Sequence, residues 1–374
     1  MPRQARFLAM CALLAATAVR AEYSLVKAYE GKGFFDDWTF WGNYDNLTGG
    51  DVDYVAASGG SDLAYVNSAG RAIIKVDNTT DLLYPNKRRS VRIETKETYP
   101  IGSLWIFDAY HVPYGCSTWP AMWSSAPNWP QGGEIDTFET VNLQEVNRMA
   151  MHTTEDCAAQ LTSANPFTGN LTFPVCDSRA NYNSGCGIEE VNTASSGEAF
   201  ASAGGGVWVT EMGVEGVKIW FFSRSDVPAD LLNASSIPNP SSWPTPSASY
   251  SEDICDVADH FAPQHLVLNI ALCGELAGNA GVRNETGCPA TNSDGCYINY
   301  VLDKRNYDTA YFELASVRIY HNPDKAANSS TAALDGFPED QAVAGQYNSS
   351  AGRGVSGAGA IGTVMALGGL FFLV

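Results

Sequence analysis

Basic residues are scarce in this sequence. Its 374 residues contain 22 Lys and Arg against 41 Asp and Glu, which gives a formal net charge of -19 with His neutral. Because the phosphate backbone of nucleic acids repels a surface of this sign, we expect no nucleic-acid partner. Only 5 His are present, none in a His-Glu-x-x-His pattern, and no Cys-x-x-Cys pair occurs. The sequence therefore predicts no catalytic metal site.

Long amphipathic helical patterns, the Gly-x-Ser-x-Gly nucleophile motif and the P-loop are also missing. The sequence is instead rich in turn-forming and aromatic residues, with 35 Gly, 18 Pro, 9 Trp, 17 Tyr and 16 Phe. This composition suits a loop-rich β protein with a large core. Short alternating or β-branched runs predict strands at residues 71–76, 90–95, 104–110, 207–212, 217–222, 265–272 and 312–320. We therefore predict one all-β domain, an antiparallel β-sandwich, over residues 22–323.

The N-terminus has the layout of a secretory signal peptide. Arg3 and Arg6 precede an apolar run at residues 7–18, and small residues follow up to Ala21. We expect cleavage after Ala21, which removes residues 1–21. The alternative is a membrane anchor, but about 12 apolar residues fall short of the roughly 20 that span a bilayer.

The C-terminus resembles a lipid-anchor signal. A low-complexity linker over residues 324–350 ends in small residues, and an uncharged, strongly apolar end follows a short polar spacer. This order is typical of a glycosylphosphatidylinositol (GPI) signal, so we expect an anchor near Ser349 and Ser350 and removal of residues 351–374. The alternative, a transmembrane helix, usually has basic residues on its cytoplasmic flank. We expect a monomer at the cell surface or wall, anchored to the plasma membrane.

Cysteine and asparagine patterns agree with export. The chain beyond the signal peptide has an even number of cysteines, whose pairing the sequence leaves open. They are Cys116, Cys157, Cys176, Cys186, Cys255, Cys273, Cys288 and Cys296. Asn-x-Ser/Thr sequons predict N-glycosylation of an exported chain. They lie at Asn46, Asn78, Asn170, Asn233, Asn284, Asn328 and Asn348.

The candidate chemistry lies in three acids, Glu134, Asp136 and Glu139, in a strand-like run. Residues two apart on a strand share a face, so Glu134 and Asp136 point the same way, whereas Glu139 would face oppositely. A one-residue β-bulge at Thr137 or Phe138 would bring all three acids to one face, and bulges are common beside active sites. We therefore predict a bulge at this point.

Grouped carboxylates raise one another's pKa, so that one of them holds a proton. A retaining glycosidase needs this state, with one ionised carboxylate as nucleophile and one protonated acid. The alternatives are a solvent-facing acidic strand and a calcium site. Trp119, Trp123 and Trp129 precede the acids, and although each alone could belong to the core, together they suggest a cleft whose aromatic faces stack on sugars. The sequence predicts that no cofactor is required, and it does not decide whether a structural calcium ion is bound.

These motifs resemble a known family. The segments GCSTWPAMW (115–123), WPQGGEIDTFE (129–139), MHT (151–153) and LCGELAG (272–278) follow, in order, the pattern of fungal laminarinase-like endo-1,3(4)-β-glucanases of glycoside hydrolase family 16 (GH16). The resemblance covers residues 34–320. It implies a concanavalin-like jelly roll with a concave sugar-binding cleft, and retaining endo-hydrolysis of β-1,3- or mixed β-1,3(4)-glucans.

By position in the motif, the resemblance implies that Glu134 is the nucleophile, Glu139 the general acid/base and Asp136 the assisting carboxylate. It also implies that His152 lies close to the acid/base, as a polar residue of the substrate site. One departure is Leu276, where many relatives have Trp. Two further functions stay open: a cell-wall glucan transglycosylase of the same fold, and a non-catalytic glucan-binding surface protein.

Overall fold

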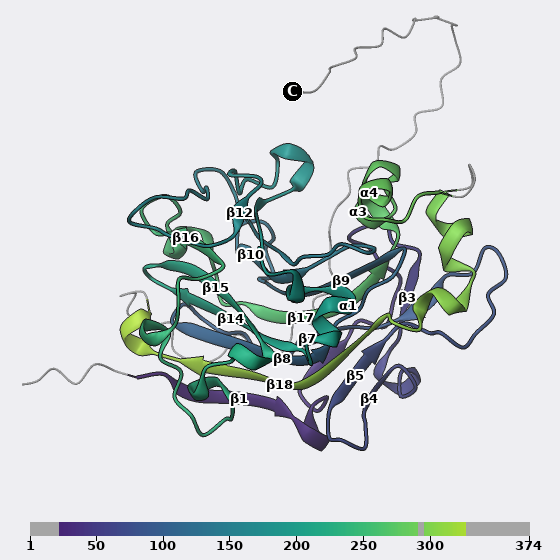
Figure 1. Ribbon diagram of the computed structural model, residues 1–374, viewed down its shortest axis with the longest axis horizontal. Helices are drawn as coiled ribbons and strands as arrows, with labels where there is room; N and C mark the ends of the chain where they lie inside the picture. The colour runs from purple at the N-terminus through teal and green to yellow at the C-terminus, as the bar shows by residue number, and fades with distance from the viewer. Residues whose placement is uncertain (1–21, 291–294, 327–374) are drawn as a thin grey trace, which may run out of the picture. The chain divides into compact units, whose positions relative to one another are not determined.

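Two antiparallel β-sheets stacked face to face make up the body of the protein (Figure 1). The computed structural model describes residues 22–290 and 295–326. The predicted signal peptide, the predicted anchor site, nearly all of the predicted linker and the sequons at Asn328 and Asn348 lie outside the described residues.

The first sheet has the strand order β16-β15-β14-β8-β18-β5-β4, and β1 also pairs with β18. Its strands are β1 (Ser24–Glu30), β4 (Ala64–Val66), β5 (Ala72–Lys75), β8 (Ser103–His111), β14 (Gly206–Gly213), β15 (Gly216–Ser223), β16 (Ala248–Ser251) and β18 (Tyr311–His321).

The second sheet has the order β12-β13-β11-β10-β9-β17-β7-β2. Its strands are β2 (Trp38–Phe40), β7 (Arg92–Thr95), β9 (Thr118–Ser125), β10 (Glu134–Glu139), β11 (Arg148–His152), β12 (Asn170–Leu171), β13 (Cys186–Glu189) and β17 (His265–Leu272). A small parallel pair joins β3 (Val52–Tyr54) to β6 (Arg88–Ser90).

Helices are short and lie in the connections. They are α1 (Gly197–Ser202), α2 (Val257–His260), α3 (Gly274–Ala277) and α4 (Ala280–Glu285), together with a π-helical turn at Tyr297–Val301 and several 3-10 turns. None of the helices in the described ranges is both long enough and apolar enough to cross a membrane.

The predicted all-β sandwich is confirmed, and every strand that we expected is present. One of them, at 90–95, is divided into β6 and β7 because the chain changes partners at the fully buried Val91. Sequence periodicity marks the extended conformation of this segment, but it carries no information on where the pairing changes.

Apolar clusters pack against both faces of the first sheet, whereas the apolar cluster between the sheets packs against one face of the second. On the inner side of β8, Trp105 and Phe107 enter the core between the sheets. On its outer side, Leu104 and Ile106 pack under Trp243, which comes from the connection before β16. Burial on both faces explains the near-continuous apolar runs of the first sheet, and it leaves the outer face of the second sheet for function.

The eight cysteines within the described residues all form disulfides. The pairs are Cys116–Cys288, Cys157–Cys255, Cys176–Cys186 and Cys273–Cys296. Among the sequons in the described ranges, Asn170, Asn233 and Asn284 are exposed, whereas Asn46 and Asn78 are half-buried. The Asn78 side chain donates a hydrogen bond to Asp308.

Candidate active site

A β-bulge at Thr137 brings the three acids to one face of the second sheet. Asp136 pairs with Trp123 of β9 and Phe138 with Met122, so Thr137 is the additional residue in β10. Thr137 and Phe138 are both fully buried toward the core. Because two consecutive residues point inward, Glu139 returns to the outer face with the other two acids, and the predicted bulge is confirmed.

Two of the three predicted tryptophans contact the acids through their indole N–H groups. Trp119 donates from Nε1 to Glu139 Oε1 over 2.8 Å, and Trp129 donates to Glu134 Oε2. Such a donor favours the charged form of a carboxylate. These tryptophans therefore do more than offer an aromatic face, because each also fixes one oxygen of a glutamate.

The third tryptophan belongs to an aromatic surface that the sequence analysis did not identify. Trp123 donates from Nε1 to Asn269 of β17 over 2.7 Å. The Arg92 guanidinium carbon lies 5.6 Å from the centre of the Trp123 ring and 4.8 Å from that of Trp41. Trp41 and Arg92 are distant in sequence from the acids, so only the pairing of β2, β7 and β17 reveals them. Leu276, the departure from the family pattern, is half-buried in α3.

His152 lies beside Glu134 and Asp136, and the position across from Glu139 belongs to Arg148. The sequence analysis placed His152 near the acid/base Glu139. The antiparallel register of β10 and β11 pairs it with Glu134, and its charge also acts on Glu139, whose pKa it lowers. Its Nε2 is 3.3 Å from Asp136 Oδ2, and its Nδ1 is 2.9 Å from Asn183 Oδ1.

The surroundings of His152 favour its protonated form. Burial lowers its pKa, but the Glu134 carboxylate and the contact with Asp136 outweigh burial and raise the pKa to about 10. An imidazolium whose Nδ1–H is directed at Asn183 matches the 2.9 Å contact, and Nε2 makes an ion pair with Asp136 Oδ2, a buried atom that accepts no hydrogen bond in the described structure.

Arg148 is the second cation of the site, and the sequence analysis missed it. Its Nη1 lies 3.2 Å from Glu139 Oε2, and both side chains are mostly buried. Its position could have been found, because Arg148 and His152 are four residues apart on one strand and so share a face. Each glutamate therefore has one indole donor and one neighbouring cation.

Burial raises the pKa of both glutamates. Burial and the Asp136 carboxylate raise the pKa of Glu134 to about 8, although His152 opposes them. The same two causes raise the pKa of Glu139, and Arg148 opposes them. Since the acids interact strongly, their protons belong to the group rather than to single residues. A group that retains a proton near neutral pH can supply both a nucleophile and an acid.

Glu134, Asp136 and His152 also have the composition of a metal site, with candidate ligand atoms within 4.8 Å of one another. Both ring nitrogens of His152 already have contacts within the protein, Nε2 with Asp136 Oδ2 at 3.3 Å and Nδ1 with Asn183 Oδ1 at 2.9 Å. The ion pair accounts for the cluster, and we assign no metal to it.

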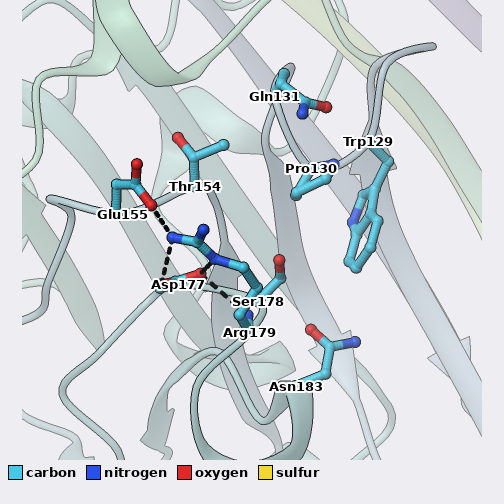
Figure 2. A pocket seen from close by; sticks show the side chains of 9 residues that line it. All are labelled: Trp129, Pro130, Gln131, Thr154, Glu155, Asp177, Ser178, Arg179 and Asn183. Atoms are coloured by element: carbon cyan, nitrogen blue, oxygen red, sulfur yellow. Dashed lines mark hydrogen bonds and ion pairs between the residues drawn. The ribbon is translucent and has the colours of Figure 1, made fainter.

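A pocket of about 520 Å³ adjoins the acids at Trp129. Figure 2 shows Trp129 and Pro130 on one side of this pocket and Asn183 on the other. Arg179 also lines the pocket, where it forms ion pairs with Asp177 and Glu155 (Figure 2). The pocket therefore lies next to the acids, behind Trp129, and its wall carries both an aromatic ring and polar groups.

Comparisons with known proteins agree with this site. The family model of XgeA-like, catalytic GH16 domains matches residues 38–320. A probable glycosidase of Schizosaccharomyces pombe is 35% identical over 301 residues, which are 80% of this chain and 69% of that protein. A probable endo-1,3(4)-beta-glucanase of Aspergillus fumigatus is 38% identical over 330 residues, which are 85% of this chain but only 49% of that protein.

Two solved structures are similar over 80% of this chain. GH16 laminarinase 16A from Phanerochaete chrysosporium, with 6-O-glucosyl-laminaritriose in both donor and acceptor sites, is 34% identical, has a TM-score of 0.74 and is covered completely. An elongating GH family 16 beta-1,3-glucosyltransferase is 34% identical, has a TM-score of 0.73 and is covered over 99% of its length. The bulged strand of acids, the sandwich that holds it and these matches identify the chain as a member of glycoside hydrolase family 16, with the catalytic domain of a glycoside hydrolase.

Proposed function

We propose that the protein is an endo-β-glucanase that hydrolyses β-1,3- or mixed β-1,3(4)-glucans with retention of anomeric configuration. The observation that carries this proposal is the bulge at Thr137, which gives Glu134, Asp136 and Glu139 one common face. A structural strand would gain nothing from bringing three acids together, since their repulsion raises the pKa of each glutamate.

The reaction would proceed by double displacement. In the first step a Glu134 oxygen bonds to the anomeric carbon while the bond to the leaving oxygen breaks, and Glu139 gives its proton to that oxygen. In the second step Glu139 takes a proton from water, whose oxygen displaces Glu134 from the anomeric carbon. Asp136 would moderate the charge of Glu134, and His152 compensates the charge of both acids.

Two observations support the proposed substrate class: the activity named for the relatives, and the aromatic rings near the acids. The curated relatives include probable endo-1,3(4)-beta-glucanases. The chain spans about half of the length of these relatives, so their activity is proposed for this protein and not transferred to it directly. Trp41, Trp123 and Trp129 offer ring faces for stacking on pyranose rings.

Glucan transfer is the second candidate, because a solved structure of equal similarity is an elongating β-1,3-glucosyltransferase. Transfer shares the first step and differs in the second, where a sugar hydroxyl replaces water. The acids serve both reactions equally, so the outcome depends on how well the pocket beside Trp129 holds an acceptor.

The test is to incubate the purified protein with laminarin, mixed-linkage β-glucan and xyloglucan, and to follow product size by chromatography and anomeric configuration by NMR. We expect shorter β-configured products from the first two polymers. Products longer than the donor would establish transfer as the main reaction. Products that first appear in the α configuration would overturn retention, and binding without cleavage would leave a glucan-binding protein.

We further propose that the protein is exported, N-glycosylated and attached to the plasma membrane as a GPI-anchored monomer facing the cell wall. Support comes from the signal-like residues 1–21, the exposed sequons at Asn170, Asn233 and Asn284, the four disulfides and the apolar end. Release of the native protein from membranes by a phosphatidylinositol-specific phospholipase would support the anchor, and its retention would contradict it.

A further inference from the structure

One short segment, Asn183–Gly187, contacts both cations of the site. Asn183 Oδ1 lies 2.9 Å from His152 Nδ1, and the Ser184 carbonyl accepts a hydrogen bond from Arg148 Nη2. These contacts use the atoms of each cation that face away from the acids. The segment is therefore a common support behind the two positive charges.

Two glycines of this segment make room for the same side chains. A Cβ atom at Gly185 would lie 2.8 Å from His152 Nε2 and 2.6 Å from the Met151 carbonyl oxygen. A Cβ atom at Gly187 would lie 2.7 Å from Arg148 Nη2. Any other residue at either position would displace a cation, so the placement of both cations requires glycine, which has no side chain, at these two positions.

The conformation of the segment is unusual and is held covalently. Asn181, Tyr182, Asn183 and Gly185 all have positive φ, at 47°, 56°, 60° and 62°. Such a run is costly for residues other than glycine, although asparagine tolerates it best. The Cys176–Cys186 disulfide closes the loop that contains the run, so the cross-link restricts the alternatives available to it.

We infer that Asn183–Gly187 is a positioning element for the reaction, in which Asn183 orients the His152 imidazolium toward Asp136 and the Ser184 carbonyl orients Arg148 toward Glu139. This inference rests on the proposed roles of Glu134 and Glu139. Asn183 is a positioning residue, since it acts on the acids only through His152.

The inference predicts a pH effect with a definite sign. The charged groups that act on His152 are Glu134, Asp136 and Glu139, all from β10, and Asn183 of the loop contacts its Nδ1. Removing the Asn183 acceptor destabilises the imidazolium and lowers the pKa of His152. A His152 cation that is no longer held by Asn183 stabilises the Glu134 carboxylate less well, so the pH at which the nucleophile ionises rises.

Asn183→Ala and Asn183→Gly test this inference, and Asn181→Ala is the matched control. Asn181 has the same residue type and a similar positive φ in the same turn, but within the described residues its side chain makes no hydrogen bond that the structure records. Asn183→Gly removes the acceptor without backbone strain. We expect both Asn183 variants to lower kcat about tenfold, as for a lost hydrogen bond to a charged group, with a smaller change in KM and an acidic limb shifted to higher pH.

The imidazole ¹⁵N resonances of His152, followed through a pH titration, give a readout that is independent of turnover. We expect the His152 midpoint to fall in both Asn183 variants and to stay constant in Asn181→Ala. If wild type cleaves glucan while Asn183→Gly keeps the wild-type profile and midpoint, the positioning role is refuted and the proposed function stands. If wild type cleaves no glucan, the proposed function fails, and the midpoints alone decide whether Asn183 holds His152.

Discussion

Thr137 of β10 and Thr210 of β14 face each other across the two sheets, with their hydroxyl oxygens 2.7 Å apart. Trp105 Nε1 also donates to the Thr137 hydroxyl. Thr137 is the bulge residue, so this contact fixes the bulge to the opposite sheet. The polar group of the bulge is thereby satisfied inside an apolar core, as a buried hydroxyl requires.

Removing one partner of this contact should therefore destabilise the fold. We expect Thr137→Val to lower the free energy of unfolding by about 1–3 kcal/mol, because it leaves the Thr210 hydroxyl and the Trp105 N–H without their partner. Urea unfolding measures the change. The double variant with Thr210→Val should recover part of the loss, since both hydroxyls are then absent. Strictly additive effects would show that the two threonines are not coupled.

Chemical rescue should separate the roles of the two glutamates. Glu134→Ala should lose about 10³-fold or more in kcat, and azide, which then attacks the anomeric carbon directly, should restore turnover as an α-glycosyl azide. Glu139→Ala should lose activity on laminarin but still cleave a dinitrophenyl β-glucoside, whose leaving group needs no proton, and azide should give a β-glycosyl azide. NMR of the azide products is the measurement. Exposed Glu30→Ala is the control, and α product from both variants would contradict the assignment.

Glu134 should make stability depend on pH. Its pKa rises from 4.5 to about 8 on folding, so the folded protein binds this proton more tightly than the unfolded chain. Stability from this group is complete below pH 4.5 and is lost as the pH rises to about 8. Glu134→Gln removes this loss. We expect the variant to gain stability relative to wild type over this interval, with a slope of at most about 1.4 kcal/mol per pH unit.

Thermal or urea unfolding of both proteins between pH 4.5 and 8 checks this expectation. The comparison also separates folding from catalysis, because the variant should be folded and inactive. A difference in unfolding free energy that stays constant with pH would show that Glu134 titrates alike in the folded and unfolded states.

The disulfides should differ in their contribution to stability. Cys116–Cys288 joins residues 172 apart in sequence, whereas Cys176–Cys186 joins residues 10 apart. On the chain-entropy account the longer loop contributes about 2.5 kcal/mol more. Paired Cys→Ser variants of each bridge, compared by urea unfolding, test this difference. We expect loss of Cys176–Cys186 to lower turnover more than loss of Cys116–Cys288 does, and loss of Cys116–Cys288 to lower the free energy of unfolding more. The reverse order in both measurements would contradict the loop-entropy argument and the positioning role of the segment that the short bridge closes.

Much of the site could be predicted from residues that are close in sequence. Strand parity placed Glu134 and Asp136 on one face, and it required a bulge before Glu139 could join them. The same parity would have found Arg148 from His152. These predictions depend only on the alternation of side chains along one strand, which is a local property of the backbone.

The partner of each side chain depended on the tertiary structure. The register of β10 against β11 decided that His152 faces Glu134 and that Arg148 faces Glu139. Folding also chose one disulfide pairing among those the even cysteine count allowed, and it brought Asn183 beneath His152 from a loop 31 residues away. The sequence by itself determined which acids are the candidates, that they share one strand and that the fold is all-β, because these properties follow from local alternation of side chains. Register, disulfide pairing and the support of the cations result from packing between distant segments, and no local pattern encodes them.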